Sequence, residues 1–177
     1  MTTSPFYQSK ALLRDVTNEL LTDIAACLCV TLEEWGLPPT CFCGVLPGQT
    51  VAIDYFGGCD DESCGNGMAW VRLAALYPAQ IVGVPMQTPG NCDSTLGMDL
   101  EIGVVRCISA GEDDGSPVSP EELAASTYLQ SQDALAMRAA MACCSPLTSK
   151  DFILGAYTPY GPDGLVVGGT WTAVVVI

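Results

Sequence analysis

The chain has 177 residues, of which 49% are apolar and 15% charged, so it has the length of one domain and is too apolar to be disordered. Twenty acidic residues against six basic ones give a formal net charge of −14, and histidine is absent. Nucleic-acid binding needs clustered lysine and arginine, whereas Ser-His-Asp triads, Cys-His pairs and HExxH zinc sites need histidine. The composition excludes these classes.

The length of the apolar runs bears on membrane association. No run approaches the roughly 20 residues that a membrane-spanning helix needs. The first ten residues also lack the basic and then apolar pattern of a signal peptide. We therefore expect a soluble protein that is made in a cytoplasm and has no membrane partner.

The N-terminal segment predicts a long helix over about residues 5–35. Its apolar residues recur every four positions, at Leu12, Val16, Leu20, Ile24 and Leu28. Pro5 suits the first turn, and Gly36 followed by Pro38 and Pro39 ends the helix. Residues 38–49 are expected to form a loop.

Two strands are predicted next, over about residues 49–56 and 68–77. The turn-rich, acidic residues 57–64 separate them, so we expect the two strands to be antiparallel neighbours. The second strand contains Trp70, Val71, Leu73 and Leu76 and a single charge, Arg72. This pattern predicts a central strand that is covered on both faces and ends at Pro78.

A third strand is predicted over about residues 97–108. Leu100, Ile102 and Val104 should face one side, and Asp99, Glu101, Gly103, Val105 and Cys107 the other. Arg72 and Arg106 are expected to pair across strands with Asp54, Asp99 or Glu101. Residues 79–96 have little periodicity and are expected to project as a loop that makes contacts.

A second helix is predicted over residues 120–143. Ser119 caps it, Pro120 takes its first position and Glu122 completes a capping box. An apolar face is predicted from Leu123, Tyr128, Leu135, Ala139 and Ala142.

Residues 151–177 predict a β-hairpin. Its last strand, ending in Trp171-Thr172-Ala173-Val174-Val175-Val176-Ile177, would aggregate as an exposed edge and must be paired or covered. The whole pattern therefore predicts a single α+β domain over residues 1–177. We expect an antiparallel sheet of four to five strands with two main helices packed on one face. Trp70 and Trp171 are expected in its core.

Ten cysteines leave three alternatives open: free buried thiols, a zinc site, or disulfides formed after the protein leaves the reducing cell. Cys41, Cys43, Cys59 and Cys64 flank one predicted strand, so this cluster is the candidate for zinc or disulfides. Cys107 is a candidate partner for Cys143 or Cys144. We assign no catalytic residue, no cofactor and no established metal ligand, and we expect no enzyme activity.

Several short segments from Cys64 onwards resemble a known family. They are residues 64–73 (CGNGMAWVRL) with Tyr77-Pro78, residues 100–107 (LEIGVVRC), residues 155–159 (GAYTP) with Gly161-Pro162, and residues 168–172 (GGTWT). Together they resemble the small head-to-tail joining proteins of long-tailed actinobacteriophages, and most closely the tail terminators. The resemblance covers roughly residues 55–177.

The resemblance implies a structural virion protein with a tail-terminator-like fold, in which helices flank an antiparallel sheet. Members form a ring, typically a hexamer, at the head–tail junction of the virion. The ring terminates the tail tube and joins it to the head connector. The expected partners are therefore further copies of the chain, the tail tube protein and the head connector or stopper protein, and genome DNA passes through the lumen without specific binding.

Other functions stay open at this point. One is another neck protein, such as a head-completion or stopper protein, although these tend to be helical or barrel-like. A second is a small cysteine-rich zinc-binding domain, or an enzyme that uses zinc or carboxylates. A third is a cytosolic binding module.

Overall fold

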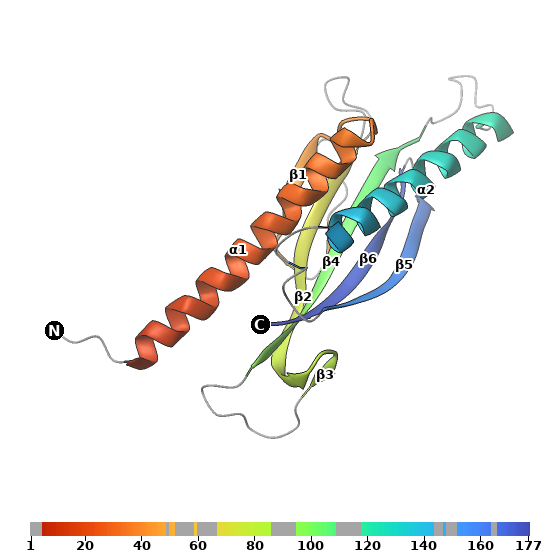
Figure 1. Cartoon of the computed structure of the whole chain (residues 1–177). Coiled ribbons are helices and arrows are strands. Elements are labelled where there is room, and N and C mark those ends of the chain that lie inside the picture. Colours follow the sequence, from red (N-terminus) through yellow and green to blue (C-terminus); the bar gives the residue numbers. More distant parts are fainter. Residues whose placement is uncertain are drawn as a thin grey trace.

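The computed structural model describes residues 5–48, 50–51, 59, 67–85, 95–108, 118–143, 147, 152–163 and 166–177. Their elements follow the order α1 (Pro5–Glu34), β1 (Phe42–Val45), β2 (Met68–Ile81), β3 (Val84–Pro85), β4 (Leu96–Cys107), α2 (Pro120–Cys143), β5 (Phe152–Asp163) and β6 (Val166–Val176). The two helices form one layer and the sheet forms the other (Figure 1). The fold class is therefore α+β, as predicted.

The sheet has six strands, in the order β1-β2-β4-β6-β5, with the short β3 paired to β2. All these pairs are antiparallel except β1 with β2, which is parallel. The expectation of four to five antiparallel strands was therefore wrong in number and in direction. β1 was missed because it has only four residues and lies within residues 38–49, which were expected to form a loop.

The last strand is protected as expected. β6 pairs along its length with β4 on one side and with β5 on the other, which confirms the predicted hairpin. The outer strand β5 contains Pro159 and Pro162, residues that natural sheets tolerate at an edge because proline offers no N–H to the ladder.

One face of the sheet packs against both helices. Ile24 and Leu28 of α1 and Met137 and Met141 of α2 are fully buried against it. The residues below them alternate along each strand and include Val71, Leu100, Ile102, Val104, Ala173 and Val175. The alternation predicted for β4 is therefore confirmed, as is the position of the two helices on one face.

The ends of both helices lie where the sequence predicted them. At the start of α2 the Ser119 N–H donates to the Glu122 carboxylate (3.0 Å), and the Glu122 N–H donates to the Ser119 hydroxyl (3.2 Å). These two bonds are the predicted capping box. Neither helix in the described part of the chain is apolar enough along its length to cross a membrane.

The face of α2 that is buried differs from the predicted one. Asp133, Ala136, Met137, Ala140 and Met141 are buried, whereas Leu123, Tyr128 and Leu135 are exposed. The prediction grouped apolar residues by their position around the helix, but close packing of α2 on the sheet selects small and flexible side chains on another side. It also selects Asp133, whose charge has a buried partner in β4.

β2 is longer than predicted, since it continues through Pro78 to Ile81 and turns back into β3. The N–H of Ala79 donates to the Thr95 carbonyl, on the β4 side of the strand. The backbone nitrogen of Pro78, which has no hydrogen to donate, therefore faces away from β4. β1 pairs with β2 only as far as Val71, which leaves this proline tolerated. Of the predicted strand over residues 49–56 only residues 50 and 51 are described, and neither lies in a strand. Of the expected loop over residues 79–96, residues 86–94 lie outside the described residues, and most of the others belong to β2, β3 and β4 rather than to a loop.

Candidate functional site

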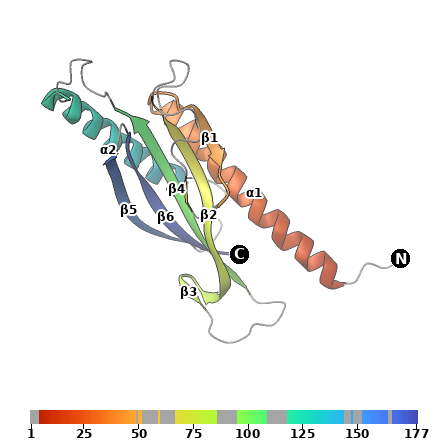
Figure 2. The same ribbon diagram turned by 180° about the vertical axis from the view of Figure 1, so that it is seen from behind.

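The sheet face opposite the helices is the candidate functional surface, and we call it the open face. It carries Trp70 and Arg72 of β2, Asp99 and Glu101 of β4, and Thr170 of β6, at positions that alternate with the core residues. Figure 2 shows the sheet from this side, with both helices behind it. Sequence alternation placed Asp99 and Glu101 correctly on this face and gave them one expected role, as cross-strand partners of Arg72 or Arg106.

Trp70 lies flat on the open face because its cross-strand neighbour has no side chain. Trp70 pairs with Gly103 of β4, and a Cβ added to Gly103 would lie 2.1 Å from Cζ2 of the indole. The indole is only 3% exposed and packs with Met68 and Val105 in a second, smaller apolar cluster. The sequence prediction that Trp70 is a core residue is confirmed. The core to which it belongs is the smaller apolar cluster on the open face.

A charged network adjoins this cluster. The guanidinium of Arg72 donates to both carboxylate oxygens of Glu101, from Nε at 2.6 Å and from Nη2 at 2.7 Å. The indole N–H of Trp70 also donates to Glu101 (3.3 Å), and Arg72 reaches the Gly48 carbonyl (3.2 Å). Both charged side chains are largely buried, at 12% and 16% exposure. The predicted cross-strand pairing of Arg72 is confirmed, and its bidentate geometry rigidifies the face.

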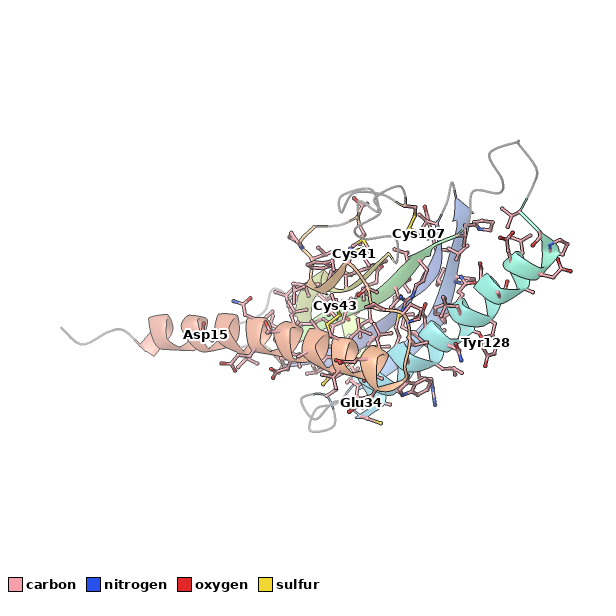
Figure 3. All side chains as sticks on the ribbon, turned by 90° about the horizontal axis from the view of Figure 1, so that it is seen from above. Asp15, Glu34, Cys41, Cys43, Cys107 and Tyr128 are labelled. Carbon is pink, nitrogen blue, oxygen red and sulfur yellow. A yellow bond between two sulfur atoms is a disulfide. The ribbon has the colours of Figure 1, made fainter. Side chains whose placement is uncertain are left out.

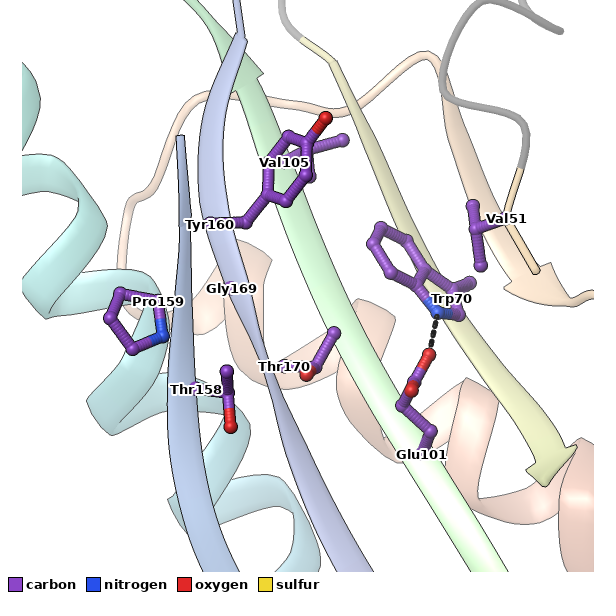
Figure 4. A pocket seen from close by; sticks show the side chains of 9 residues that line it. All are labelled: Val51, Trp70, Glu101, Val105, Thr158, Pro159, Tyr160, Gly169 and Thr170. Carbon is purple, nitrogen blue, oxygen red and sulfur yellow. Dashed lines mark hydrogen bonds between the residues drawn. The ribbon is translucent and has the colours of Figure 1, made fainter. Parts of the chain in front are cut away.

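A pocket of about 190 Å³ lies beside this network (Figure 4). Its wall combines apolar and hydroxyl groups from four strands and one loop: Val51, Trp70, Glu101, Val105, Thr158, Pro159, Tyr160, Gly169 and Thr170. The only charged group on this wall, Glu101, already accepts three hydrogen bonds. Such a surface suits packing against another protein surface better than binding of an ion.

At the far end of the open face Tyr77 donates a hydrogen bond to Asp99 (2.8 Å). Burial of the phenol and this bond to a carboxylate raise the pKa of Tyr77 to about 12. The side chain therefore stays neutral throughout the physiological range. A Cβ on Gly97 would lie 2.5 Å from the Tyr77 ring, so glycine at this position allows the ring to lie on the strand.

On the helix side of the sheet, Arg106 forms a buried ion pair with Asp133 of α2. Its Nε and Nη2 donate to the two carboxylate oxygens at 2.9 and 2.8 Å, and Nη1 donates to the Pro38 carbonyl. The side chains are 3% and 0% exposed. Arg106 was expected to pair across strands. Instead it ties β4 to α2 and to the segment that follows α1.

Gln130 and Trp171 extend this attachment of α2 to the sheet. Gln130 donates to the carbonyls of Gly168 and Tyr160, and the Trp171 indole N–H donates to the Ala134 carbonyl (2.8 Å). Trp171 packs against the main core, as predicted. The helix is therefore fixed to β4, β5 and β6 by polar contacts as well as by apolar ones.

The cysteines of the predicted cluster do not bond to one another in the pairs that are described. Cys43 forms a disulfide with Cys29 of α1, and Cys59 forms one with Cys107 at the end of β4. Cys41 is also disulfide-bonded, as is Cys27. Figure 3 shows Cys41, Cys43 and Cys107 from above, and Cys64 lies outside the described residues.

The disulfides bear directly on the alternatives for the cysteines. A sulfur in a disulfide is no thiolate ligand, so Cys43 and Cys59 cannot hold zinc while bonded. Cys107 bonds to Cys59, and the expectation that it pairs with Cys143 was wrong, since Cys143 is a free, exposed thiol. Within the described residues no group of three or more Cys, Asp or Glu side chains could hold a metal ion.

Comparison with known protein families finds no family model that matches this chain, and no curated protein matches it. The function therefore has to be argued from the residues and the geometry described above.

Proposed function

We propose that this protein is a structural component of a phage particle. In this proposal it forms a ring at the head–tail junction, which ends the tail tube and joins it to the head connector. The protein is then tail-terminator-like in fold and has further copies of itself, the tail tube protein and the connector as its partners.

The observation that carries the proposal is the position of the residues that resemble tail terminators. The described strand residues of these segments are 68–73, 77–78, 100–107, 155–159, 161–162 and 168–172. They are far apart in sequence and fall in β2, β4, β5 and β6, four adjacent strands of one sheet. Segments that resembled the family only by chance would not be expected to lie on adjacent strands of one sheet.

The charge of the chain agrees with a role around passing DNA. A ring of copies that each carry −14 would surround the genome with like charge, which opposes adhesion of DNA to the channel wall. The disulfides agree with a particle that leaves the reducing cell after assembly.

The proposal is tested with the purified full chain and with isolated tail tubes from the same particle. We expect mass measurement to give a closed oligomer, and electron microscopy to show a ring seated on one end of the tube. A protein that stays monomeric both alone and with tubes would contradict the proposal.

A further inference from the structure

The first half of α1 extends beyond the sheet that its second half covers. Figures 1 and 3 show the N-terminal part of the helix diverging from the body of the molecule. Among the described side chains the first buried one is Leu20, whereas residues 15–19 are exposed or half-buried. We call residues 5–19 the N-terminal arm. At about 1.5 Å per residue it is about 22 Å long.

The sequence of the arm continues the pattern that the rest of α1 buries. Leu20, Ile24 and Leu28 are buried against the sheet and α2, and Leu12 and Val16 continue their four-residue spacing into the arm. A helix of this length is marginal in water without packing. The continued apolar spacing therefore indicates that the arm has a partner surface outside its own copy.

Charge identifies the kind of surface that the arm would bind. Residues 1–14 contain two bases, Lys10 and Arg14, and no acid. The remaining residues then hold the other four bases and all twenty acids, a formal charge of −16. Within the arm Lys10 and Arg14 are balanced by Asp15 and Glu19, so only its first two thirds, up to Arg14, is cationic. This cationic, apolar part is electrostatically complementary to acidic groups of a second copy.

The outer face of α2 has the matching properties. Tyr128 and Leu135 are 66% and 54% exposed and lie seven residues apart, which places them on the same side of the helix. Figure 3 shows Tyr128 on the side of α2 away from the sheet. Glu121 and Glu122 are exposed in the first turn, and Arg138 is exposed towards the other end. We call this surface, from Glu121 to Arg138, the α2 outer face.

The order of charges sets the direction of docking. The arm runs from Lys10 and Arg14 to Asp15 and Glu19, whereas the α2 outer face runs from two glutamates to Arg138. Opposite charges meet when the two helices lie parallel. Since the arm and the α2 outer face are different surfaces, such a contact is head-to-tail and can close into a ring.

We propose that the N-terminal arm of one copy docks on the α2 outer face of the next, with the apolar positions Leu12 and Val16 against Tyr128 and Leu135. This inference rests on the proposed ring and specifies its contact between neighbouring copies. It leaves the open face available for the tail tube or the connector.

The test uses full-length variants and measures mass in solution across a concentration series. Leu12→Asp disables the arm, and Tyr128→Asp disables the α2 outer face. We expect each variant to be monomeric at concentrations where the wild type assembles. The concentration for half-assembly should rise roughly tenfold or more, because both substitutions remove a central apolar contact. Two control variants should assemble like the wild type. Asn18→Asp adds the same charge at a position outside the four-residue apolar spacing, and Tyr128→Phe keeps the aromatic side chain.

Mixing the two monomeric variants gives the most specific result. The arm of Tyr128→Asp is intact and so is the α2 outer face of Leu12→Asp, so an equimolar mixture should form dimers and nothing larger. A mixture that stays monomeric would overturn the inference. So would wild-type assembly by Leu12→Asp, or a wild-type protein that is monomeric at every concentration and binds anionic vesicles through the arm instead.

The outcomes separate this inference from the proposed function. A closed ring on tail tubes whose mass is unchanged by Leu12→Asp would overturn the arm contact and leave the ring proposal in place. Dimers or open chains that depend on Leu12 and never seat on a tube would support the arm contact and contradict the proposed function.

Discussion

Two tyrosine hydroxyls in this protein have contrasting surroundings. Tyr77 donates to Asp99, whereas the hydroxyl of Tyr157 is buried without a hydrogen-bond partner among the described residues. Tyr157 packs against Trp171 with ring centroids 5.8 Å apart. Burial, and then the charge of Asp133, raise the pKa of Tyr157 to about 12.

These pKa values predict a loss of stability in alkali. Both pKa values are raised from 10.0 to about 12 in the folded protein, so the phenols ionise first in the unfolded chain. Stability is therefore unaffected below about pH 10 and falls as the pH rises from about 10 to 12. Urea unfolding at pH 9 and 11 should show this fall. A Cys143→Ser background removes the free thiol found among the described residues, which reduces thiol exchange during the measurement.

Tyr157→Phe isolates the contribution of Tyr157. At neutral pH we expect the free energy of unfolding to be unchanged or up to about 1 kcal/mol higher, because the removed hydroxyl has no described partner. Part of the alkaline fall should also disappear. Exposed Tyr128→Phe should change neither quantity. An alkaline fall of the same size in Tyr157→Phe would contradict the assignment.

At the scale of single residues the sequence predicted more about strands than about contacts. The alternation in β4 separated Leu100 from Glu101 because a strand changes face at every residue. The contact of Trp70 with Gly103 was not predicted, since it depends on the pairing of β2 with β4. The alternation within each strand, once combined with this register, was the signal that could have found it.

Between elements, breaking the Arg106–Asp133 ion pair should lower the free energy of unfolding strongly, whereas replacing both residues by apolar ones should lower it little. Asp133→Ala leaves a buried guanidinium, for which we expect a loss of about 3–5 kcal/mol in the free energy of unfolding. The double variant Arg106→Met with Asp133→Leu removes both charges and should recover most of that loss. Urea unfolding of Arg106→Met, Asp133→Leu and the double variant forms the cycle. Additive losses would contradict a direct pair.

The disulfide between α1 and β1 gives a second prediction at this scale. Cys29 and Cys43 are 14 residues apart, a loop for which cross-linking contributes roughly 3 kcal/mol. Cys29→Ser with Cys43→Ser should lower the melting temperature under non-reducing conditions, while Cys143→Ser should leave it unchanged. A melting temperature equal to that of the wild type would show that the bond contributes no stability.

The elements that the sequence predicted well carry local signals. α1 has its four-residue spacing, and α2 has a capping box, both of which act within a few residues. β1 was missed because its four residues gain their strand structure from β2, about 26 residues later. The buried face of α2 was missed because Asp133 is stabilised by Arg106, a residue in another element.

For the whole molecule, the charge gives a direct prediction. We expect no measurable binding of duplex DNA even at about 50 mM salt, where phosphate contacts are strong. Fluorescence anisotropy of a labelled duplex checks this. A charge-reversed variant such as Glu33→Lys with Glu34→Lys is a useful comparison, because both residues are exposed on α1. Tight wild-type binding with a steep salt dependence would contradict a channel that repels the genome.

The place of β6 between β4 and β5 has a consequence for biosynthesis. β2 and β4 form one locally paired ribbon and β5 and β6 another, and β4 is translated about 60 residues before β6. The valine-rich last strand thus leaves the ribosome when a partner edge has already been made. Misfolding during translation is limited because the interval in which this strand lacks a neighbour is short.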